Sequence, residues 1–224
     1  MDWLFISILL SLVMAIILTV NSQGLRSPDR RKIAFSYFLR NRWDIILLQE
    51  THWTVDMEME IKREWIGDVF FNHGTNNARG VAILIHSRLE CTVSQIRSDN
   101  EGRILNILLE FDDHTLNIVN IYAPQTDSDR RAFFASLDGF ISEDLDNIIG
   151  GDYNCISNAR LDKFGGNPNA RNFAATTLHG ICMRHNISDI WRHTSKVALL
   201  AHQSSTPPLP TSPPPPLPTS PPRS

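Results

Sequence analysis

Four short apolar runs along the chain are each followed immediately by polar side chains. The runs are Met14–Val20, Asp44–Leu48, Asn117–Ile121 and Asn147–Ile149. Their length and β-branched content predict strands that are covered on both faces. The strings NSQG, QET, YAP and GGDYN follow them in that order. Because sites in layered α/β folds assemble outside the carboxyl ends of strands, we expect these polar groups to meet at one site.

Apolar residues recur at helical spacing in three other stretches. They predict helices over Pro28–Asn41, Ser128–Leu145 and Asn172–His185. Two further apolar runs, Gly80–His86 and Ile104–Phe111, predict strands. The resulting order is strand, helix, strand, several strands, helix, strand, helix. That order predicts an α/β (α+β) protein in which two sheets pack together with helices outside them.

The first apolar stretch, Trp3–Val20, has two interpretations. At 18 residues it approaches the length of about 20 that a membrane span needs, and the basic residues after it would then hold the downstream side in the cytoplasm. Alternatively, only Met14–Val20 forms a buried strand, and residues 1–13 are an apolar N-terminal extension. The recurrence of the same pattern three more times favours the strand.

The end of the chain changes in composition. From Ala201 onward it is rich in Pro, Ser and Thr, and Pro207–Pro222 is a perfect tandem repeat of PPLPTSPP. Ten of the 13 prolines lie there, so we expect residues 197–224 to be a disordered, polyproline-like tail behind a domain over residues 14–196. Its PPLP copies could dock in WW or SH3 grooves, although such repeats also arise as unselected low-complexity sequence.

Charge and cysteine content narrow the classes of function. The net charge of −3 provides no global basic field to recruit nucleic acid, but an acidic site that holds a divalent cation is compatible with it. The cysteines, Cys91, Cys155 and Cys182, are odd in number and have no CxxC spacing. They predict neither a disulfide framework nor a zinc site, and favour a reducing, intracellular location in the nucleus or cytoplasm.

The polar residues beyond the strands are individually ordinary turn or surface residues, and together they suggest one chemistry. Mg²⁺ takes oxygen ligands from one or two carboxylates and shares the rest of its shell with water and substrate phosphate. Glu50 could supply the metal-bound carboxylate, with Asn21 beside it. Asp152 and Asn154 could orient the attacking water and a phosphate oxygen, and Tyr122 could donate to the phosphate. The set predicts phosphodiester hydrolysis.

Several longer strings then resemble a known family. LLQETHW, GVAIL, NIYAP and GGDYN are similar to successive motifs of the endonuclease/exonuclease/phosphatase superfamily, whose members include exonuclease III and DNase I. RRKIAFSYFLRNRWDIILLQETHW, HGTNNARGVAIL, LDKFGGN and ISDIWR resemble its LINE-type retrotransposon branch. The resemblance implies a four-layer β-sandwich flanked by helices and DNA nicking that depends on Mg²⁺, or on Mn²⁺ in its place. The 3′-hydroxyl at the nick would prime reverse transcription.

By motif, the resemblance assigns a role to each candidate residue. Glu50 resembles the metal-binding Glu and Asn21 its companion Asn. Tyr122 resembles the phosphate-contacting Tyr, and Asp152 and Asn154 resemble the Asp-x-Asn pair. Related phosphodiesterases that act on sphingomyelin or inositol phosphates share these motifs, but the form LLQETHW favours the nucleic-acid branch.

After Trp191 the sequence departs from the family. The resemblance predicts closing strands and a final Ser-Asp-His motif, whereas the chain reads HTSKVALLAHQSS and then the proline repeats. His193 and His202 have no acidic neighbour in sequence. We therefore expect a domain that lacks its C-terminal strands and has weak or no activity, because lost acid–base assistance typically costs about 10²–10⁴ in rate. The alternative is a non-enzymatic retroelement fragment that acts as a proline-rich ligand or is anchored to a membrane.

Overall fold

The computed structural model describes residues 15–75, 78–155 and 173–190. Met1–Ser188 forms one compact unit and Asp189–Ser224 a second, of which only Asp189 and Ile190 are described. The predicted extension over residues 1–13, the proline-rich tail over residues 197–224, and His193 and His202 lie outside the described residues. Among the residues that are described, no helix is both long and apolar enough to cross a membrane.

Two mixed sheets, each of four strands, carry the first unit. The first sheet has the order β1-β2-β4-β3, in which β1 and β2 are parallel and the other neighbours antiparallel. The second has the order β5-β6-β7-β8, in which β7 and β8 are the parallel pair. The strands are β1 (Ile17–Asn21), β2 (Ile45–Gln49), β3 (Gly67–Asn72), β4 (Val81–His86), β5 (Thr92–Ser98), β6 (Ile104–Glu110), β7 (Thr115–Tyr122) and β8 (Asp146–Asp152).

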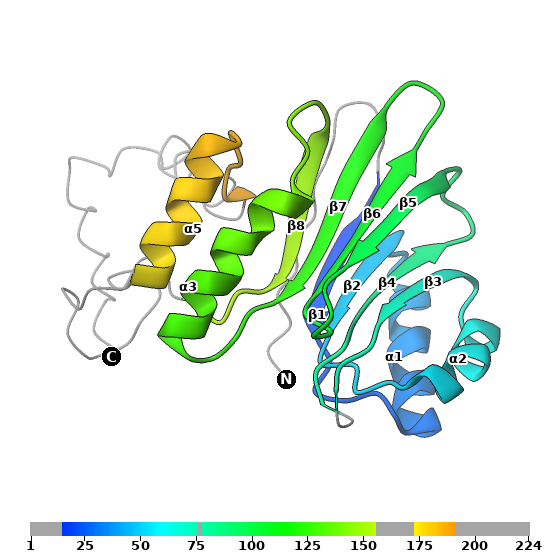
Figure 1. Ribbon diagram of the computed structural model, residues 1–224. Helices are drawn as coiled ribbons and strands as arrows, with labels where there is room; N and C mark the ends of the chain where they lie inside the picture. Colours follow the sequence, from blue (N-terminus) through cyan, green and yellow to red (C-terminus); the bar gives the residue numbers. More distant parts are fainter. Residues whose placement is uncertain (1–14, 76–77, 156–172, 191–224) are drawn as a thin grey trace, which may run out of the picture. The chain divides into compact units, whose positions relative to one another are not determined.

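Helices cover the outer face of each sheet, as Figure 1 shows. On the first sheet these are α1 (Pro28–Arg40) and α2 (Glu58–Glu64), which follows the short 3₁₀ helix η1 (Val55–Met57). On the second sheet they are α3 (Asp127–Ser136), the 3₁₀ helix η2 (Leu137–Phe140) and α5 (Phe173–Arg184). Helix, sheet, sheet and helix form four layers, which confirms the fold expected from the sequence.

The inner faces of the two sheets pack against each other in an apolar core. Alternate residues of β2, such as Ile45 and Leu47, face alternate residues of β6 and β7, such as Ile107 and Ile118, and all four are at most 1% exposed. The intervening residues, such as Leu48 on β2 and Val119 on β7, point outward to the helices. Both faces of these strands are buried, which is why the sequence shows short continuous apolar runs.

The apolar runs of the sequence do form strands, with shifted ends. β8 extends past its predicted end to Asp152, so the Gly-Gly pair lies within the strand and not in a turn. The helix predicted over Ser128–Leu145 is too long: α3 ends at Ser136 and η2 at Phe140. Beyond them the side chain of Asn147 accepts from the backbone amide of Ser142 and donates to its carbonyl. These two hydrogen bonds fix the loop in a non-helical conformation. The strands β3 and β5 and the helix α2 were not predicted.

Candidate active site

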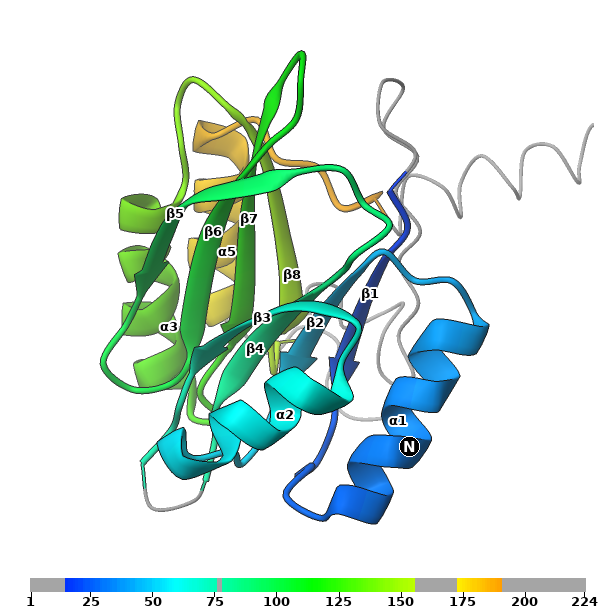
Figure 2. The same ribbon diagram turned by 90° about the vertical axis from the view of Figure 1, so that its right-hand side faces the viewer.

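The carboxyl ends of the two parallel strand pairs meet, and four of the predicted residues lie there. Asn21 is the last residue of β1 and Glu50 follows β2, while Tyr122 and Asp152 end β7 and β8 in register with each other. The edge strands β1 and β8 face each other across the sandwich, and Figure 2 shows β1, β2 and β8 ending close together. The chain therefore brings residues 131 positions apart into one cluster.

The side-chain amide of Asn21 joins the two carboxylates. Its Nδ2 donates to Glu50 Oε1 at 2.9 Å and to Asp152 Oδ2 at 2.8 Å, while its Oδ1 accepts from the backbone amide of Gln23 at 3.1 Å. Glu50 and Asp152 belong to different sheets, so this one amide also links the two sheets at the site. Two carboxylates so close together concentrate negative charge at the strand ends.

Tyr122 supplies a phenol beside these carboxylates. It is 8% exposed, and burial raises the pKa of the phenol well above its ordinary value, with a hydrogen bond to Glu50 and the charges of Glu50 and Asp152 adding to the effect. The guanidinium of Arg103 lies 5.3 Å from the centre of the Tyr122 ring and donates to the Tyr122 carbonyl at 3.0 Å. The phenol therefore keeps its proton and remains a hydrogen-bond donor.

Asn154 lies next to Asp152 in a left-handed backbone conformation, with φ of 45°. Its backbone amide donates to Asp152 Oδ1 at 3.0 Å, and its side-chain Nδ2 donates to the carbonyl of Ala123 at 2.8 Å. Asn154 therefore ties the loop after β8 to the loop after β7 and fixes the second oxygen of Asp152. Its role toward a water or a phosphate stays a prediction.

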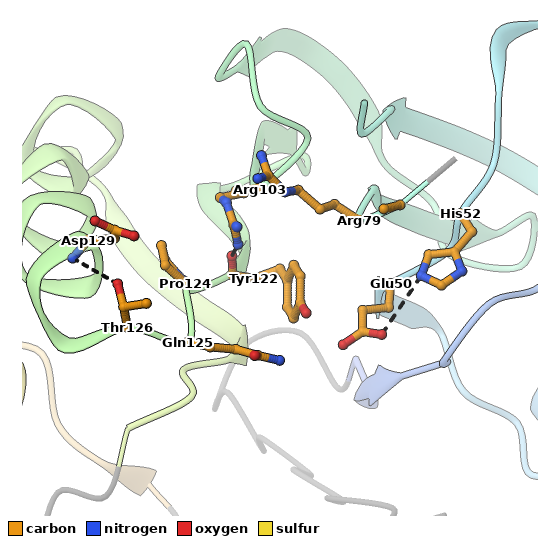
Figure 3. A pocket seen from close by; sticks show the side chains of 10 residues that line it. Glu50, His52, Arg79, Arg103, Tyr122, Pro124, Gln125, Thr126 and Asp129 are labelled. Atoms are coloured by element: carbon orange, nitrogen blue, oxygen red, sulfur yellow. Dashed lines mark hydrogen bonds and ion pairs between the residues drawn. The ribbon is translucent and has the colours of Figure 1, made fainter. Parts of the chain in front are cut away.

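A pocket of about 350 Å³ opens beside Glu50 and Tyr122. Figure 3 shows Glu50 and His52 on one side, Tyr122 and Arg103 next to them, and the start of α3 on the other. His52, Arg79 and Arg103 were not singled out from the sequence. His52 lies within the LLQETHW string that carried Glu50, and Arg79 lies within the HGTNNARGVAIL string, whereas Arg103 stands in a loop without a motif that could have identified it. His52 Nε2 lies 3.8 Å from Glu50 Oε2.

The donor atoms of the cluster fit a hard divalent cation. Across the described ranges no group of three or more His, Cys, Asp or Glu side chains is arranged to hold a metal ion by itself. Mg²⁺ does not need one, because it typically uses one or two carboxylates and keeps several waters. Glu50 and Asp152 supply two carboxylates joined by one amide, and their negative charge, which adds to the effect of burial on the Tyr122 pKa, is the charge a cation would neutralise.

Asp113 and His114 are neighbours in sequence and form an Asp-His pair that lies outside the candidate active site. Its side chains interact at 2.6 Å in the turn between β6 and β7, with the His114 ring stacked on Phe111 at 4.7 Å. That turn lies at the opposite end of β7 from Tyr122. The pair stabilises a turn and takes no part in the cluster at the strand ends.

Two packed mixed sheets with carboxylates and amides gathered at one edge define the class of DNase I-like α/β sandwiches. The chain belongs to the endonuclease/exonuclease/phosphatase family, whose profile matches residues 18–223. A 149 kDa protein of unassigned function from the transposon TX1 of Xenopus laevis is 34% identical over 177 residues, which are 78% of this chain. That match supports the retrotransposon branch. The chain spans 13% of the length of that relative.

Solved structures share the fold. The catalytic domain of Xenopus laevis APE2 matches with a TM-score of 0.58 and 21% identity, over 74% of this chain and 67% of that one. An AP endonuclease from Leishmania major matches at 0.55 and 17%, over 76% and 66%. The endonuclease domain of TRAS1, a telomere-specific non-LTR retrotransposon, matches at 0.54 and 15%, over 75% and 71%. At these identities the likeness shows the fold.

Proposed function

We propose that this chain hydrolyses phosphodiester bonds of DNA in a Mg²⁺-dependent reaction and nicks one strand. One observation carries the proposal: the Asn21 amide joins the carboxylates of Glu50 and Asp152, and Glu50 lines a pocket together with Tyr122. Family membership and the match to the TX1 protein support a nucleic acid as the substrate. Cleavage that supplies a 3′-hydroxyl to prime reverse transcription fits that relative's origin in a transposon.

Glu50 and Asn21 are the residues that would hold the cation. Asn21 would present its side-chain oxygen or release the amide contact, since the oxygen and nitrogen of an amide exchange places by a simple flip. When bound, Mg²⁺ supplies charge neutralisation for the phosphoryl oxygens. Mn²⁺ is an acceptable substitute because carboxylate, carbonyl and water oxygens suit both ions.

The remaining residues position and donate. Asp152, held at one oxygen by Asn21 and at the other by the Asn154 amide, has free lone pairs with which it orients the attacking water. Tyr122, whose raised pKa keeps its phenolic hydrogen in place, would turn that hydrogen from Glu50 to a phosphate oxygen when the substrate binds. Arg103 and Arg79 add positive charge to the wall of the pocket that faces the polyanionic strand.

We also propose that turnover is slow. In the part of the chain that the structure describes, the histidine lining the pocket is His52, and its partner is Glu50, already engaged by Asn21. A histidine oriented by its own aspartate is therefore missing from the described part of the site. General acid–base assistance of that kind typically contributes about 10²–10⁴ in rate.

Nicking of supercoiled plasmid DNA by the full chain, with Mg²⁺ and then with EDTA, tests both statements. We expect slow, EDTA-sensitive conversion to the open circle. Glu50→Ala should lower the rate more than about 100-fold. Loss of a residue that only orients a metal ligand costs up to about 100-fold, and Glu50 is proposed as a ligand itself. Glu110→Ala, an exposed glutamate at the far end of β6, should leave it unchanged. Cleavage by the wild type that is no faster than cleavage by Glu50→Ala would contradict the proposed activity. Rapid cleavage by the wild type would contradict the proposed slow turnover.

A further inference from the structure

Three polar side chains lie inside the otherwise apolar core between the two sheets. They are Thr19 on β1, Gln49 on β2 and Asn120 on β7, which are 3%, 1% and 0% exposed. Each occupies an inward position of its strand, continuing the alternation of Ile17, Leu47 and Ile118. Burial of an amide without partners costs free energy, so such residues persist where their hydrogen bonds are made.

Hydrogen bonds from Gln49 and Asn120 cross from one sheet to the other. Gln49 Nε2 donates to Asn120 Oδ1 at 2.7 Å, and Asn120 Nδ2 donates to the carbonyls of Leu48 and Ala82, both at 2.9 Å. Within the first sheet, Gln49 Nε2 also donates to Thr19 Oγ1 at 3.1 Å. The amide pair thus connects β1, β2 and β4 of one sheet with β7 of the other.

The sheets approach closely at the same level. Gly150 on β8 is in register with Asn120, and a methyl group at Gly150 would lie 2.4 Å from Leu47 Cδ1 on β2. A side chain at position 150 would therefore displace the end of the Leu47 side chain, so glycine suits the close approach of the sheets at this level. Thr19, Gln49, Asn120 and Gly150 lie at one level of the sandwich, and we call these four residues the amide layer.

The amide layer lies directly beneath the candidate active site. Asn21, Tyr122 and Asp152 each follow a member of the layer by two residues on the same strand, and Glu50 follows Gln49 directly. Two residues of a strand span about 7 Å. On every strand that carries the cluster, the next inward position below the site residue therefore belongs to the amide layer.

We propose that Gln49 and Asn120 are positioning residues that fix the two sheets in the register at which Glu50, Asn21, Asp152 and Tyr122 come together. Apolar contacts are non-directional and allow sheets to slide, whereas a buried hydrogen bond lost on sliding leaves an unpaired polar group. The catalytic consequence rests on the proposed function, because a misplacement of 1 Å can cost about 10² in rate. The geometric consequence does not depend on it.

A ¹⁹F NMR experiment on the full chain labelled with 3-fluorotyrosine tests the geometry. The chain has three tyrosines, and the Tyr122 signal is assigned by its loss in Tyr122→Phe. We expect one narrow Tyr122 resonance in the wild type, and a broadened or split one in Gln49→Leu and Asn120→Leu. Asn106→Leu is the matched control, since Asn106 is 1% exposed and donates to Asn117 within the second sheet alone. Its Tyr122 resonance should stay narrow.

The double variant Gln49→Leu/Asn120→Leu separates positioning from stability. Removal of both partners should restore much of the melting temperature lost in the single variants, because neither buried amide is left without its partner. The Tyr122 resonance should remain broadened. In nicking assays kcat should fall about tenfold or more in the single and double variants, with KM nearly unchanged, while Asn106→Leu keeps the wild-type kcat.

Two results would overturn the proposal: a narrow, unshifted Tyr122 resonance in both single variants, or equal broadening in Asn106→Leu at a matched melting temperature. A wild-type chain that does not nick DNA would overturn the proposed function alone, since the ¹⁹F spectra would still decide whether the amide layer fixes the site.

Discussion

Left-handed backbone conformations gather around the candidate site. Glu50, His52 and Asn154 have φ values of 52°, 57° and 45°, and Gln23 and Arg79 nearby have 49° and 64°. Non-glycine residues adopt such angles at a cost, and they persist where surrounding contacts hold them. Here each follows a strand or sits in a loop at the same edge, so the chain turns sharply after each strand and leaves the side chains at the strand ends.

The raised pKa of Tyr122 predicts how stability depends on alkaline pH. The folded chain holds the phenolic proton more tightly than the unfolded chain, so this contribution is complete below the unfolded pKa of about 10 and is lost as pH rises above it. Urea unfolding should show the wild type losing stability relative to Tyr122→Phe between pH 9 and about pH 11. Parallel curves for the two proteins over that range would contradict the burial of a neutral phenol.

The lowered pKa of His86 predicts that stability falls at acidic pH. Burial and then the charge of Arg88 lower the pKa of its imidazole, which packs edge-on against Trp65. The unfolded chain therefore binds the proton more readily, and stability is lost as pH falls below the unfolded pKa of about 6.5. His86→Gln should lose less stability than the wild type between pH 7 and pH 5 in thermal melts. An equal loss in both would show that His86 does not carry the effect.

At the scale of elements, two side chains anchor the loop that leads from Asn21 to α1. The carbonyl of Leu25 accepts from the Trp53 indole at 2.8 Å and from Arg31 at 3.4 Å. Arg31 is fully buried and also binds the Arg26 carbonyl and the carboxylate of Glu64 on α2. The helices of the first sheet thus hold the loop that carries the start of the site.

Replacement of that anchor should affect stability. Arg31→Met keeps an unbranched apolar stem but removes the guanidinium, leaving the Arg26 carbonyl and the Glu64 carboxylate without their donor. Because hydrogen bonds to charged groups are worth about 1.5–3 kcal/mol, we expect the free energy of unfolding to fall by about 2 kcal/mol or more. Chemical denaturation measures it, with the exposed Arg40→Met on the same helix as the control. A loss within about 0.5 kcal/mol would contradict the anchoring role.

Glycine at position 151 should be essential to β8. Its φ is 142°, and a Cβ there would lie 2.0 Å from the backbone carbonyl oxygen of Ile121, which cannot move aside. Gly151→Ala should therefore lower the free energy of unfolding by at least about 2 kcal/mol. Gly139→Ala, where a Cβ meets nothing within 4 Å, should change it by less than about 0.5 kcal/mol. Equal unfolding curves for the two variants would contradict this account of β8.

At the scale of the molecule, the strands that carry the site could be predicted because both of their faces are buried. Each of β1, β2, β7 and β8 contains a short run of apolar residues, and polar residues mark the strand ends. β5 could not be predicted, since its residues are mostly exposed and polar. The joining of Glu50 and Asp152 through Asn21 depends on packing between sheets, which no local pattern encodes.

Other features could not be predicted from the sequence either, because they also depend on tertiary packing. Gln49 and Asn120 look like ordinary polar residues at strand ends, and only the stacking of the two sheets shows that they are buried and paired. Asn147 on β8 binds the backbone of Ser142 in the loop after α3 and η2. Helical periodicity does not contain this contact, which is why the predicted helix ran too far. Sequence patterns thus identified most of the elements and four residues that the structure brings together, whereas the hydrogen bonds between those residues follow from the tertiary structure.

We propose that Asn21 at the end of β1 and Glu50 directly after β2, beside Asp152 of β8, form one site for a divalent cation. Titration of the full chain with Mn²⁺, followed by electron paramagnetic resonance, tests it without any requirement for turnover. We predict a single site per chain that is lost or weakened more than about tenfold in Glu50→Ala and Asn21→Ala. The control Glu110→Ala should bind as the wild type does. Mn²⁺ binding that is unchanged in the first two variants, or absent from the wild type, would contradict the claim.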